Sequence, residues 1–184
     1  MMEGSKEKKE KKKRIVPIWV CILIFIGAFF AGMISKVAIK PAWSTKYTAT
    51  WSEELGTKIT DISYGDGEAN KFDLYLPKDS TKDTYGLVIY LHAGGFTSGD
   101  KADDENMLAW LCSKGYVAAG INYTLRTDTN NASVLLQSNE IKEAIPIVVE
   151  EAKNRGYNID KMTVAGGSAG HALAMIYAYR DAQD

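Results

Sequence analysis

Three short apolar runs, separated by segments with helical spacing, limit the fold of this chain more than any other feature. The runs at residues 87–91 and 117–121 have the uninterrupted apolar character of strands that are buried in a parallel sheet, and the run at 162–165 is the next predicted strand. A helix that begins near Asp103 or Asp104 and ends at Gly115 is predicted between the first two. Between the second and third, apolar residues recur at helical spacing, namely Ile141, Ala144, Ile145, Val148 and Ala152. This order predicts an α/β fold with right-handed crossovers, a mostly parallel sheet and helices on both faces.

Residues 58–77 come before this unit and have the pattern of an antiparallel hairpin. Ile59 and Ile62 lead into a turn signal at residues 64–67. After the turn, Phe72, Leu74 and Leu76 alternate with Lys71, Asp73 and Tyr75 until Pro77 ends the run. We therefore expect two paired strands at the start of the domain.

A charged tail and a long uncharged run form the N-terminal part of the chain. Residues 1–14 contain seven Lys or Arg and three Glu, so they carry a net charge of +4 and the other residues carry −5. Such a low-complexity tail is predicted to be disordered. Residues 15–34 contain no charged side chain, and a helix of about 20 residues spans a hydrocarbon core about 30 Å thick. We expect a transmembrane anchor at residues 15–35, so the membrane is a predicted partner.

A cleaved signal peptide is the alternative interpretation of this run. Its apolar region would measure about 7–15 residues and end at a cleavage site of small residues. The run here is longer, and residues 35–40 offer a poor site, which favours an uncleaved anchor. The basic residues before the run predict a single-pass protein with residues 1–14 in the cytoplasm and the domain on the outer side. Residues 36–57 are then a linker, and residues 58–184 form the domain.

Several functional classes are not expected from the composition. The Lys and Arg residues of the domain are scattered among carboxylates and form no stripe, so nucleic acid is not a predicted partner. Cys21 lies in the membrane run and Cys112 in the domain, so we expect no disulfide. Two distant cysteines and two histidines do not suggest a metal site. We expect no cofactor, and the oligomeric state is not indicated.

Residues 166–170, which read Gly-Gly-Ser-Ala-Gly, follow the third apolar run and precede a helical segment. A G-x-S-x-G turn between a strand and a helix exposes its serine hydroxyl to a substrate. Small residues at 166 and 170 leave room for the turn, in which the serine backbone is strained. Ser168 is therefore the predicted nucleophile; the alternative is a chance match in a glycine-containing loop.

A second motif follows the first apolar run, where residues 92–95 read His-Ala-Gly-Gly. Adjacent glycines allow the backbone to approach a ligand with its N–H groups pointing into a site. If Ser168 attacks a carbonyl group, the N–H groups of Gly94, Gly95 and Ala169 can stabilise the developing oxyanion. Because each motif supplies what the other needs, the pair favours catalysis over a chance match.

These motifs occur in the order found in a known superfamily. The hairpin ending at Pro77, residues 92–95, the Asn-Tyr-Thr-Leu sequence at 122–125 and residues 166–170 together resemble the α/β-hydrolase superfamily, in its esterase and lipase group with an H-G-G-G oxyanion loop. The resemblance covers residues 58–180 and implies hydrolysis of small-molecule carboxylic esters. It also implies that His92 supports the oxyanion loop. Ala93 departs from the pattern, but the family's donors fall on the positions of Gly94 and Gly95.

The triad that the resemblance implies is not complete in this sequence. In the family the acid and the histidine follow the serine, but only 16 residues follow Ser168. His171 and His92 fit structural roles better than that of a base, and Asp181 and Asp184 lie close to the end. We expect the acid and base of the triad to be absent from this chain and the sheet to be incomplete at its C-terminal side, so that the chain corresponds to the N-terminal part of a hydrolase.

The sequence therefore predicts a membrane-anchored serine hydrolase that acts on carboxylic esters through an acyl-enzyme on Ser168. Two alternatives stay open. One is a catalytically inactive, membrane-tethered remnant of the fold. The other is a peptidase or acyltransferase, because the same turn and loop serve any acyl transfer.

Overall fold

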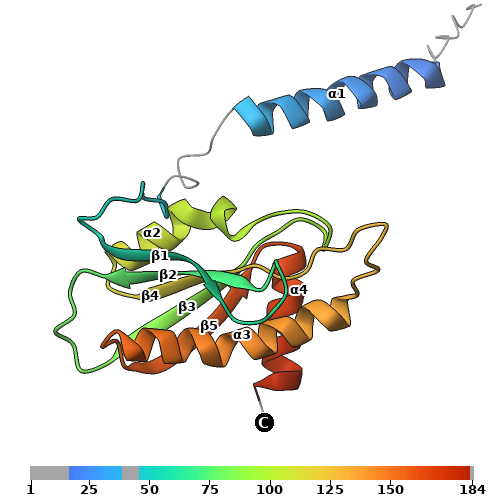
Figure 1. Ribbon diagram of the computed structural model, residues 1–184. Helices are drawn as coiled ribbons and strands as arrows, with labels where there is room; N and C mark the ends of the chain where they lie inside the picture. The colour runs from blue at the N-terminus through green and yellow to red at the C-terminus, as the bar shows by residue number, and fades with distance from the viewer. Residues whose placement is uncertain (1–16, 39–45, 183–184) are drawn as a thin grey trace, which may run out of the picture. The chain divides into compact units, whose positions relative to one another are not determined.

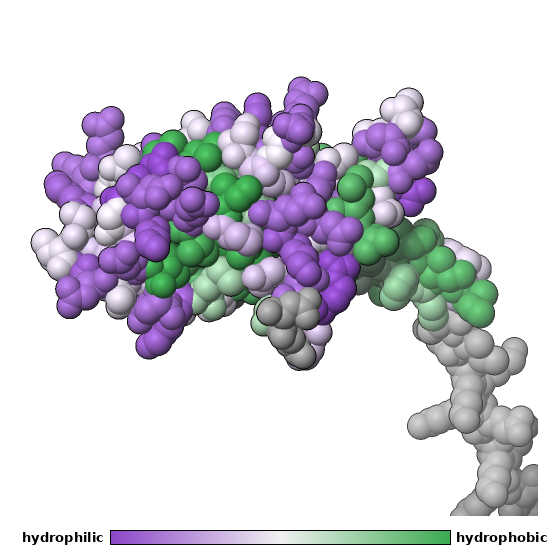
Figure 2. Space-filling view, turned by 60° about the horizontal axis from the view of Figure 1, so that its bottom comes forward, coloured by the Kyte–Doolittle hydropathy of each residue, from purple (hydrophilic) through white to green (hydrophobic). Residues whose placement is uncertain are grey.

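The computed structural model describes residues 17–38 and 46–182, which belong to two separate units. The first unit contains helix α1 (Ile18–Ala38), whose large apolar side chains are exposed. Its surface is green, hence hydrophobic, in Figure 2. By length and composition alone, α1 can cross a membrane. The predicted anchor at 15–35 overlaps this helix, whereas the predicted tail and residues 39–45 of the predicted linker lie outside the described residues.

The second unit contains a five-stranded mixed sheet with the strand order β1-β2-β4-β3-β5 (Figure 1). Its strands are β1 (Gly56–Ser63), β2 (Lys71–Pro77), β3 (Tyr85–Leu91), β4 (Val117–Ile121) and β5 (Ile159–Gly166). The predicted hairpin is present, because β1 and β2 pair antiparallel, and β2 also pairs antiparallel with β4. Strands β4, β3 and β5 are parallel. The expected α/β fold with an N-terminal hairpin is confirmed.

Helices cover both faces of the sheet (Figure 1). Helix α2 (Glu105–Ser113) packs on one face, and α3 (Val134–Asn154) and α4 (Ala169–Ile176) pack on the other. The apolar residues that predicted α3 are all buried in the main core. A π-helical turn, η3 (Tyr177–Asp181), continues α4. Because β3 and β5 are parallel neighbours, their C-terminal ends lie at the same edge of the sheet.

Helix α2 begins where the sequence pattern predicted, because its N-cap position is Asp104, although the Asp104 side chain forms no capping hydrogen bond. A short 3-10 helix that was not predicted, η2 (Lys101–Asp104), precedes α2, and the N-cap of η2 is Asp100. The Asp100 side chain accepts a hydrogen bond from the Ala102 N–H, and the Asp103 carboxylate accepts one from the Asp100 N–H. This reciprocal capping box satisfies two backbone donors at once and stabilises an additional helical turn, η2, ahead of the predicted helix.

Strand β2 is also more buried than its alternating sequence indicated. Every residue from Phe72 to Pro77 is buried, because β1 and β4 flank the strand and helices cover both of its faces. Asp73, which alternates with apolar neighbours in the sequence, is 2% exposed. It lies opposite Gly120 of β4 and forms an ion pair with Lys101, which is described below.

Candidate active site

The two motifs predicted to carry the chemistry lie at the same edge of the sheet. Leu91, the last residue of β3, pairs with Gly166, the last residue of β5. Because these strands are parallel neighbours, the loops that follow them emerge side by side. The Gly167 N–H donates a hydrogen bond of 3.2 Å to the Leu91 carbonyl. The structure thus brings the serine turn and the His92 loop together.

Ser168 occupies a sharp turn between β5 and α4. Its backbone has φ 46° and ψ −110°, a conformation that few residues other than glycine adopt. A Cβ atom at Gly166 would overlap the carbonyl group of Gly170, and one at Gly170 would overlap the Leu91 carbonyl oxygen. Both glycines are therefore required by the close approach of main chains. The turn leaves Ser168 exposed to solvent.

The loop after β3, residues 92–100, is closed on itself by hydrogen bonds to one carbonyl. The N–H groups of Thr97 and Ser98 donate to the Gly94 oxygen at 3.1 and 3.0 Å, and the Ser98 hydroxyl donates to it at 3.0 Å. Gly94, Gly95 and Phe96 all have positive φ, at 134°, 62° and 70°. A Cβ atom at Gly94 would overlap the Ser98 carbonyl, so this tight turn needs a glycine there.

The predicted oxyanion donors have no competing acceptor in the described part of the chain. The N–H groups of Gly94 and Gly95 donate no hydrogen bond to another described residue, and neither does that of Ala169, the first residue of α4. Ala169 also lies at the positive end of the helix dipole. Three N–H groups from two adjoining turns are thus available to a negatively charged oxygen.

His92 is enclosed beneath this loop. Its ring is 1% exposed and stacks on Tyr123 with the ring centroids 4.4 Å apart. The Tyr123 hydroxyl donates to the His92 carbonyl at 3.0 Å, and His92 Nδ1 lies 2.8 Å from the Ala93 carbonyl oxygen. Its Nε2 is buried and has no hydrogen-bond partner among the described residues. The environment of His92 suits support of the loop rather than proton transfer at Ser168.

No described acid or histidine forms a hydrogen bond with the Ser168 hydroxyl. His171 lies on the first turn of α4 and is exposed. Asp181 is held by Arg180, whose Nε lies 2.7 Å from its Oδ1, and by Lys142. The hydrogen bond from Arg180 lowers the pKa of Asp181. Asp184 lies outside the described residues.

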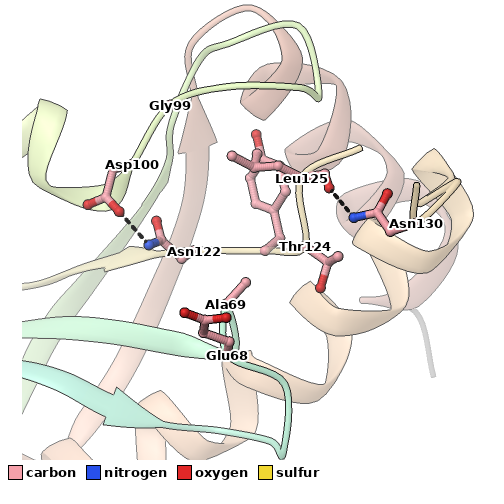
Figure 3. Close-up of a pocket in the computed structure, with 9 residues that line it drawn as sticks. Glu68, Ala69, Gly99, Asp100, Asn122, Thr124, Leu125 and Asn130 are labelled. Atoms are coloured by element: carbon pink, nitrogen blue, oxygen red, sulfur yellow. Dashed lines mark hydrogen bonds between the residues drawn. The ribbon is translucent and has the colours of Figure 1, made fainter. Parts of the chain in front are cut away.

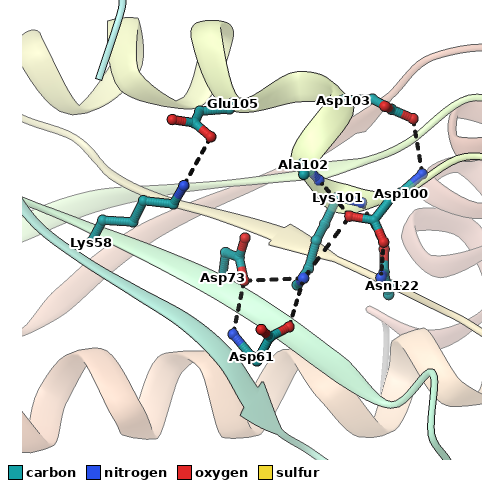
Figure 4. Close-up of polar contacts among 9 residues, drawn as sticks. All are labelled: Lys58, Asp61, Asp73, Asp100, Lys101, Ala102, Asp103, Glu105 and Asn122. Atoms are coloured by element: carbon teal, nitrogen blue, oxygen red, sulfur yellow. Dashed lines mark hydrogen bonds and ion pairs between the residues drawn. The ribbon is translucent and has the colours of Figure 1, made fainter. Parts of the chain in front are cut away.

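A cluster of ion pairs around the buried Lys101 fixes the far end of the loop to the sheet (Figure 4). Lys101 Nζ lies 2.9 Å from Asp61 Oδ1 and 3.3 Å from Asp73 Oδ1. Burial alone would lower the pKa of Lys101, but the hydrogen bond to Asp61 and the charge of Asp73 outweigh it and raise that pKa. The Asn122 side chain accepts from the Lys101 N–H at 2.7 Å and donates to Asp100 at 2.7 Å. These contacts leave the end of the loop little freedom.

A pocket of about 410 Å³ lies beside the end of the loop (Figure 3). Figure 3 shows Glu68 and Ala69, from the turn before β2, across from the segment that follows β4. The loop contributes Gly99 and Asp100 to the pocket, whose lining residues are Glu68, Ala69, Gly99, Asp100, Asn122, Tyr123, Thr124, Leu125 and Asn130. Ser168 does not line it. Among the described residues, no group of three His, Cys, Asp or Glu side chains is placed to hold a metal ion.

The sequence interpretation missed the polar side chains that brace the loop from helix α3. Gln137 and Glu140 are buried within the apolar face of that helix. Gln137 Nε2 donates to the carbonyl oxygens of Phe96 and Thr124. The available signal was the position of both polar residues in line with the apolar Ile141, Ala144 and Val148.

Comparisons with known proteins agree with this geometry. The chain is 29% identical over 123 residues to kynurenine formamidase of Salmo salar. The aligned residues cover 66% of this chain and 39% of that protein. It is 26% identical over 121 residues to the probable carboxylic ester hydrolase LipM of Mycobacterium tuberculosis, covering 64% of this chain and 27% of that protein.

Two solved esterases have a similar fold. Esterase B from Lactobacillus rhamnosis superposes with a TM-score of 0.62 at 23% identity, covering 86% of this chain and 48% of that one. Apo esterase 2 of Thermogutta terrifontis gives a TM-score of 0.56 at 26% identity, covering 67% of this chain and 46% of that one. The chain thus spans less than half the length of these relatives. The BD-FAE family model matches residues 72–184, more than half of the chain, which therefore belongs to this α/β-hydrolase esterase family.

Proposed function

We propose that this protein is a membrane-anchored serine hydrolase of small-molecule carboxylic esters. Ser168 is the nucleophile, and the N–H groups of Gly94, Gly95 and Ala169 form the oxyanion hole. In this proposal the acid and the histidine of the triad are not among these 184 residues. The observation that carries the proposal is the strained, exposed Ser168 in a turn that adjoins the loop after β3, where the Gly94 and Gly95 N–H groups donate to no other described residue.

The chemistry follows from this arrangement. The Ser168 oxygen attacks the ester carbonyl carbon while a base takes the hydroxyl proton, and the carbonyl oxygen becomes an oxyanion that accepts from the three N–H groups. Loss of one such donor costs about 2.7–4 kcal/mol of transition-state stabilisation. The intermediate then collapses, the alcohol leaves with a proton, and the acyl group stays on Ser168. Water, activated by the same base, releases the acid and restores the serine.

The names of the relatives support an acyl-group hydrolase. One relative is a kynurenine formamidase and another a probable carboxylic ester hydrolase. The serine turn at residues 166–170 and the loop after β3 can serve the hydrolysis of a formamide or of an ester. They would serve a peptidase or an acyltransferase equally well. Esters are the substrate class that the family and the solved neighbours favour.

The same proposal includes the anchor. Helix α1 is long and apolar enough to span a bilayer, and the seven Lys or Arg residues of the first 14 precede it. Positive residues are retained on the cytoplasmic side. We place the tail in the cytoplasm and the catalytic domain on the outer side.

One specific observation favours a second candidate, an inactive remnant of the fold. Within the described residues, Ser168 has no hydrogen-bonded base, and a serine hydroxyl without a base is a weak nucleophile. The two candidates differ in whether Ser168 reacts with an activated phosphonate.

The test is labelling of native membranes that contain the full chain with a fluorophosphonate probe. Wild-type protein and the Ser113→Ala control, which loses an exposed hydroxyl on α2, are expected to be labelled, and Ser168→Ala is not. Labelling that survives Ser168→Ala contradicts the assignment of the nucleophile. Absence of labelling in the wild type, together with no turnover of a small activated acetate ester, supports the remnant.

A further inference from the structure

Gln137 of helix α3 joins the oxyanion loop to the segment that follows β4. The side chain is fully buried. Its Nε2 donates to the Phe96 carbonyl at 2.9 Å and to the Thr124 carbonyl at 2.8 Å. Phe96 follows Gly95 in the loop, and Thr124 lies three residues beyond the end of β4. Both amide hydrogens of one side chain are therefore used to connect two separate segments of the main chain.

The orientation of this amide is fixed by its surroundings. If the amide were rotated by half a turn, its oxygen would face two carbonyl oxygens and neither could receive a hydrogen bond. In the orientation present, Oε1 is buried and has no hydrogen-bond partner in the described part of the chain. Buried polar atoms without partners are rare in folded proteins. An apolar side chain at position 137 would have no unpaired oxygen, but it would also lose the two hydrogen bonds to the Phe96 and Thr124 carbonyls.

The anchoring end of this connection is rigid. The Thr124 N–H and hydroxyl donate to the Glu140 carboxylate at 2.7 and 2.6 Å, and Glu140 lies one turn after Gln137 on α3. The Phe96 carbonyl also accepts from the Arg126 N–H at 2.9 Å. Helix α3 thus holds Thr124 by its N–H, hydroxyl and carbonyl groups, and passes that restraint to the loop at Phe96.

A change in the backbone conformation of Phe96, the residue that Gln137 restrains, would move the N–H groups of Gly94 and Gly95. Phe96 has φ 70° directly after Gly95 at φ 62°, and a bulky residue in this left-handed region persists only where its surroundings hold it. If Phe96 returns to negative φ, the turn closed by Thr97 and Ser98 on the Gly94 carbonyl opens. The peptide groups of Gly94 and Gly95 then lose their fixed direction.

We propose that Gln137 is a positioning residue that holds the oxyanion loop in the conformation in which the Gly94 and Gly95 N–H groups are free to bind the oxyanion. This inference rests on the proposed function of the loop. Gln137 itself touches neither substrate nor Ser168; it acts through the Phe96 carbonyl.

The test uses the full chain in its native membranes and in detergent, with Gln137→Met as the main variant. Methionine has a similar length and no N–H donor. Ser138→Ala is the matched control, because it removes another buried hydrogen bond of α3, from Ser138 Oγ to the Leu135 carbonyl, away from the loop. Amide hydrogen exchange of a peptide covering residues 93–99 is measured in detergent, and the rate of Ser168 labelling by the fluorophosphonate probe is measured in the membranes.

Gln137→Met is expected to speed exchange of the Thr97 and Ser98 amides at least tenfold and to slow Ser168 labelling at least tenfold. Ser138→Ala is expected to change both by less than twofold. Unchanged loop exchange in folded Gln137→Met overturns the proposal. If the wild type is not labelled at all, the proposed function fails, and the role of Gln137 in catalysis fails with it. The exchange data still show whether Gln137 restrains the loop through the Phe96 carbonyl.

A second variant covers the case in which Gln137→Met does not fold. Gln137→Glu keeps the shape, and burial raises the pKa of the introduced carboxyl. When protonated, this group can donate one hydrogen bond to a carbonyl; when ionised, it can donate none. Loop exchange relative to Ser138→Ala at the same pH is therefore expected to slow as the pH falls. If the exchange rate of the loop amides in Gln137→Glu, relative to Ser138→Ala, does not depend on pH, the restraint of the loop by residue 137 is contradicted.

Discussion

The carbonyl oxygen of Leu91 occupies the space that a Cβ atom of residue 170 would need, so Gly170 of helix α4 packs directly against the end of strand β3. This contact places the start of the helix after Ser168 against the start of the oxyanion loop. The distance between Ser168 and the Gly94 and Gly95 N–H groups is therefore set by the contact of two main chains. No flexible side chain can adjust it.

Gly170→Ala is accordingly expected to destabilise the protein. Alanine in place of glycine favours a helix by about 1 kcal/mol, but inserting an atom into a closely packed contact costs about 1–3 kcal/mol, and here the neighbour is backbone that cannot turn away. We expect a net loss of about 1–2 kcal/mol in the free energy of unfolding, measured by urea unfolding of the detergent-solubilised chain. Gly167→Ala is the matched control, because its nearest neighbour would be the Tyr90 hydroxyl at 3.2 Å. Equal stability of the two variants would contradict this account.

Ser168 carries backbone strain that glycine would relieve. A non-glycine residue in such a conformation costs about 1–3 kcal/mol, whereas glycine brings an entropic cost of about 0.5–1 kcal/mol. Ser168→Gly is therefore expected to raise the free energy of unfolding by about 1 kcal/mol over Ser168→Ala, which keeps the Cβ atom. Urea unfolding curves of Ser168→Gly and Ser168→Ala measure this difference. If Ser168→Gly is no more stable than Ser168→Ala, the turn is not strained.

The parts of the fold that follow from local sequence patterns could be predicted, and those that depend on pairing across space could not. The apolar runs at 87–91, 117–121 and 162–165 indicated parallel strands because their patterns are local, and the glycines around Ser168 indicated the turn for the same reason. The position of β4 between β2 and β3 is not local. The full burial of β2, including Asp73 beside Lys101, depends on that position.

The candidate site shows the same division. Ser168, Gly94 and Gly95 could be named because each lies in a short motif at the end of a strand. Gln137 lies 41 residues from the carbonyl that it restrains, and no motif connects the two. A polar residue within an apolar helical face is a visible signal, but its partner is known only once α3 is docked on the sheet.

Lys101 is expected to stabilise the fold over a wide pH range. Removing one member of a buried ion pair costs about 3–5 kcal/mol, because the other charge is left without a partner, and the side chains of Lys101 and Asp73 are only 8% and 3% exposed. Lys101→Met is therefore expected to lose about 3 kcal/mol near neutral pH. Lys58→Met removes the more exposed pair with Glu105 and is expected to lose less than about 1 kcal/mol.

The pH dependence of this loss follows from two pKa shifts. The pKa of Lys101 is raised above 10.5, so its contribution is complete below that value and disappears as the pH rises through the higher pKa of the folded state. The hydrogen bond from Lys101 lowers the pKa of Asp61 below 3.8, so the contribution of Asp61 is present above 3.8 and disappears as the pH falls through the lower value. The difference in melting temperature between wild type and Lys101→Met should stay constant between these limits and shrink outside them. A difference that instead changes between pH 5 and 9 would point to another titrating group.

The last prediction concerns helix α1. An aspartate at the centre of a membrane-spanning helix costs about 2.5–3.5 kcal/mol on insertion scales, and Ile26 lies near the middle of the uncharged run. The double variant Ile26→Asp and Gly27→Asp is expected to release most of the chain from membranes washed with alkaline carbonate, because two such costs outweigh the gain from the remaining apolar residues. The control Ile26→Val keeps the apolar character and should stay in the membrane fraction. Retention of the double variant at the level of the control would mean that α1 is not the membrane anchor.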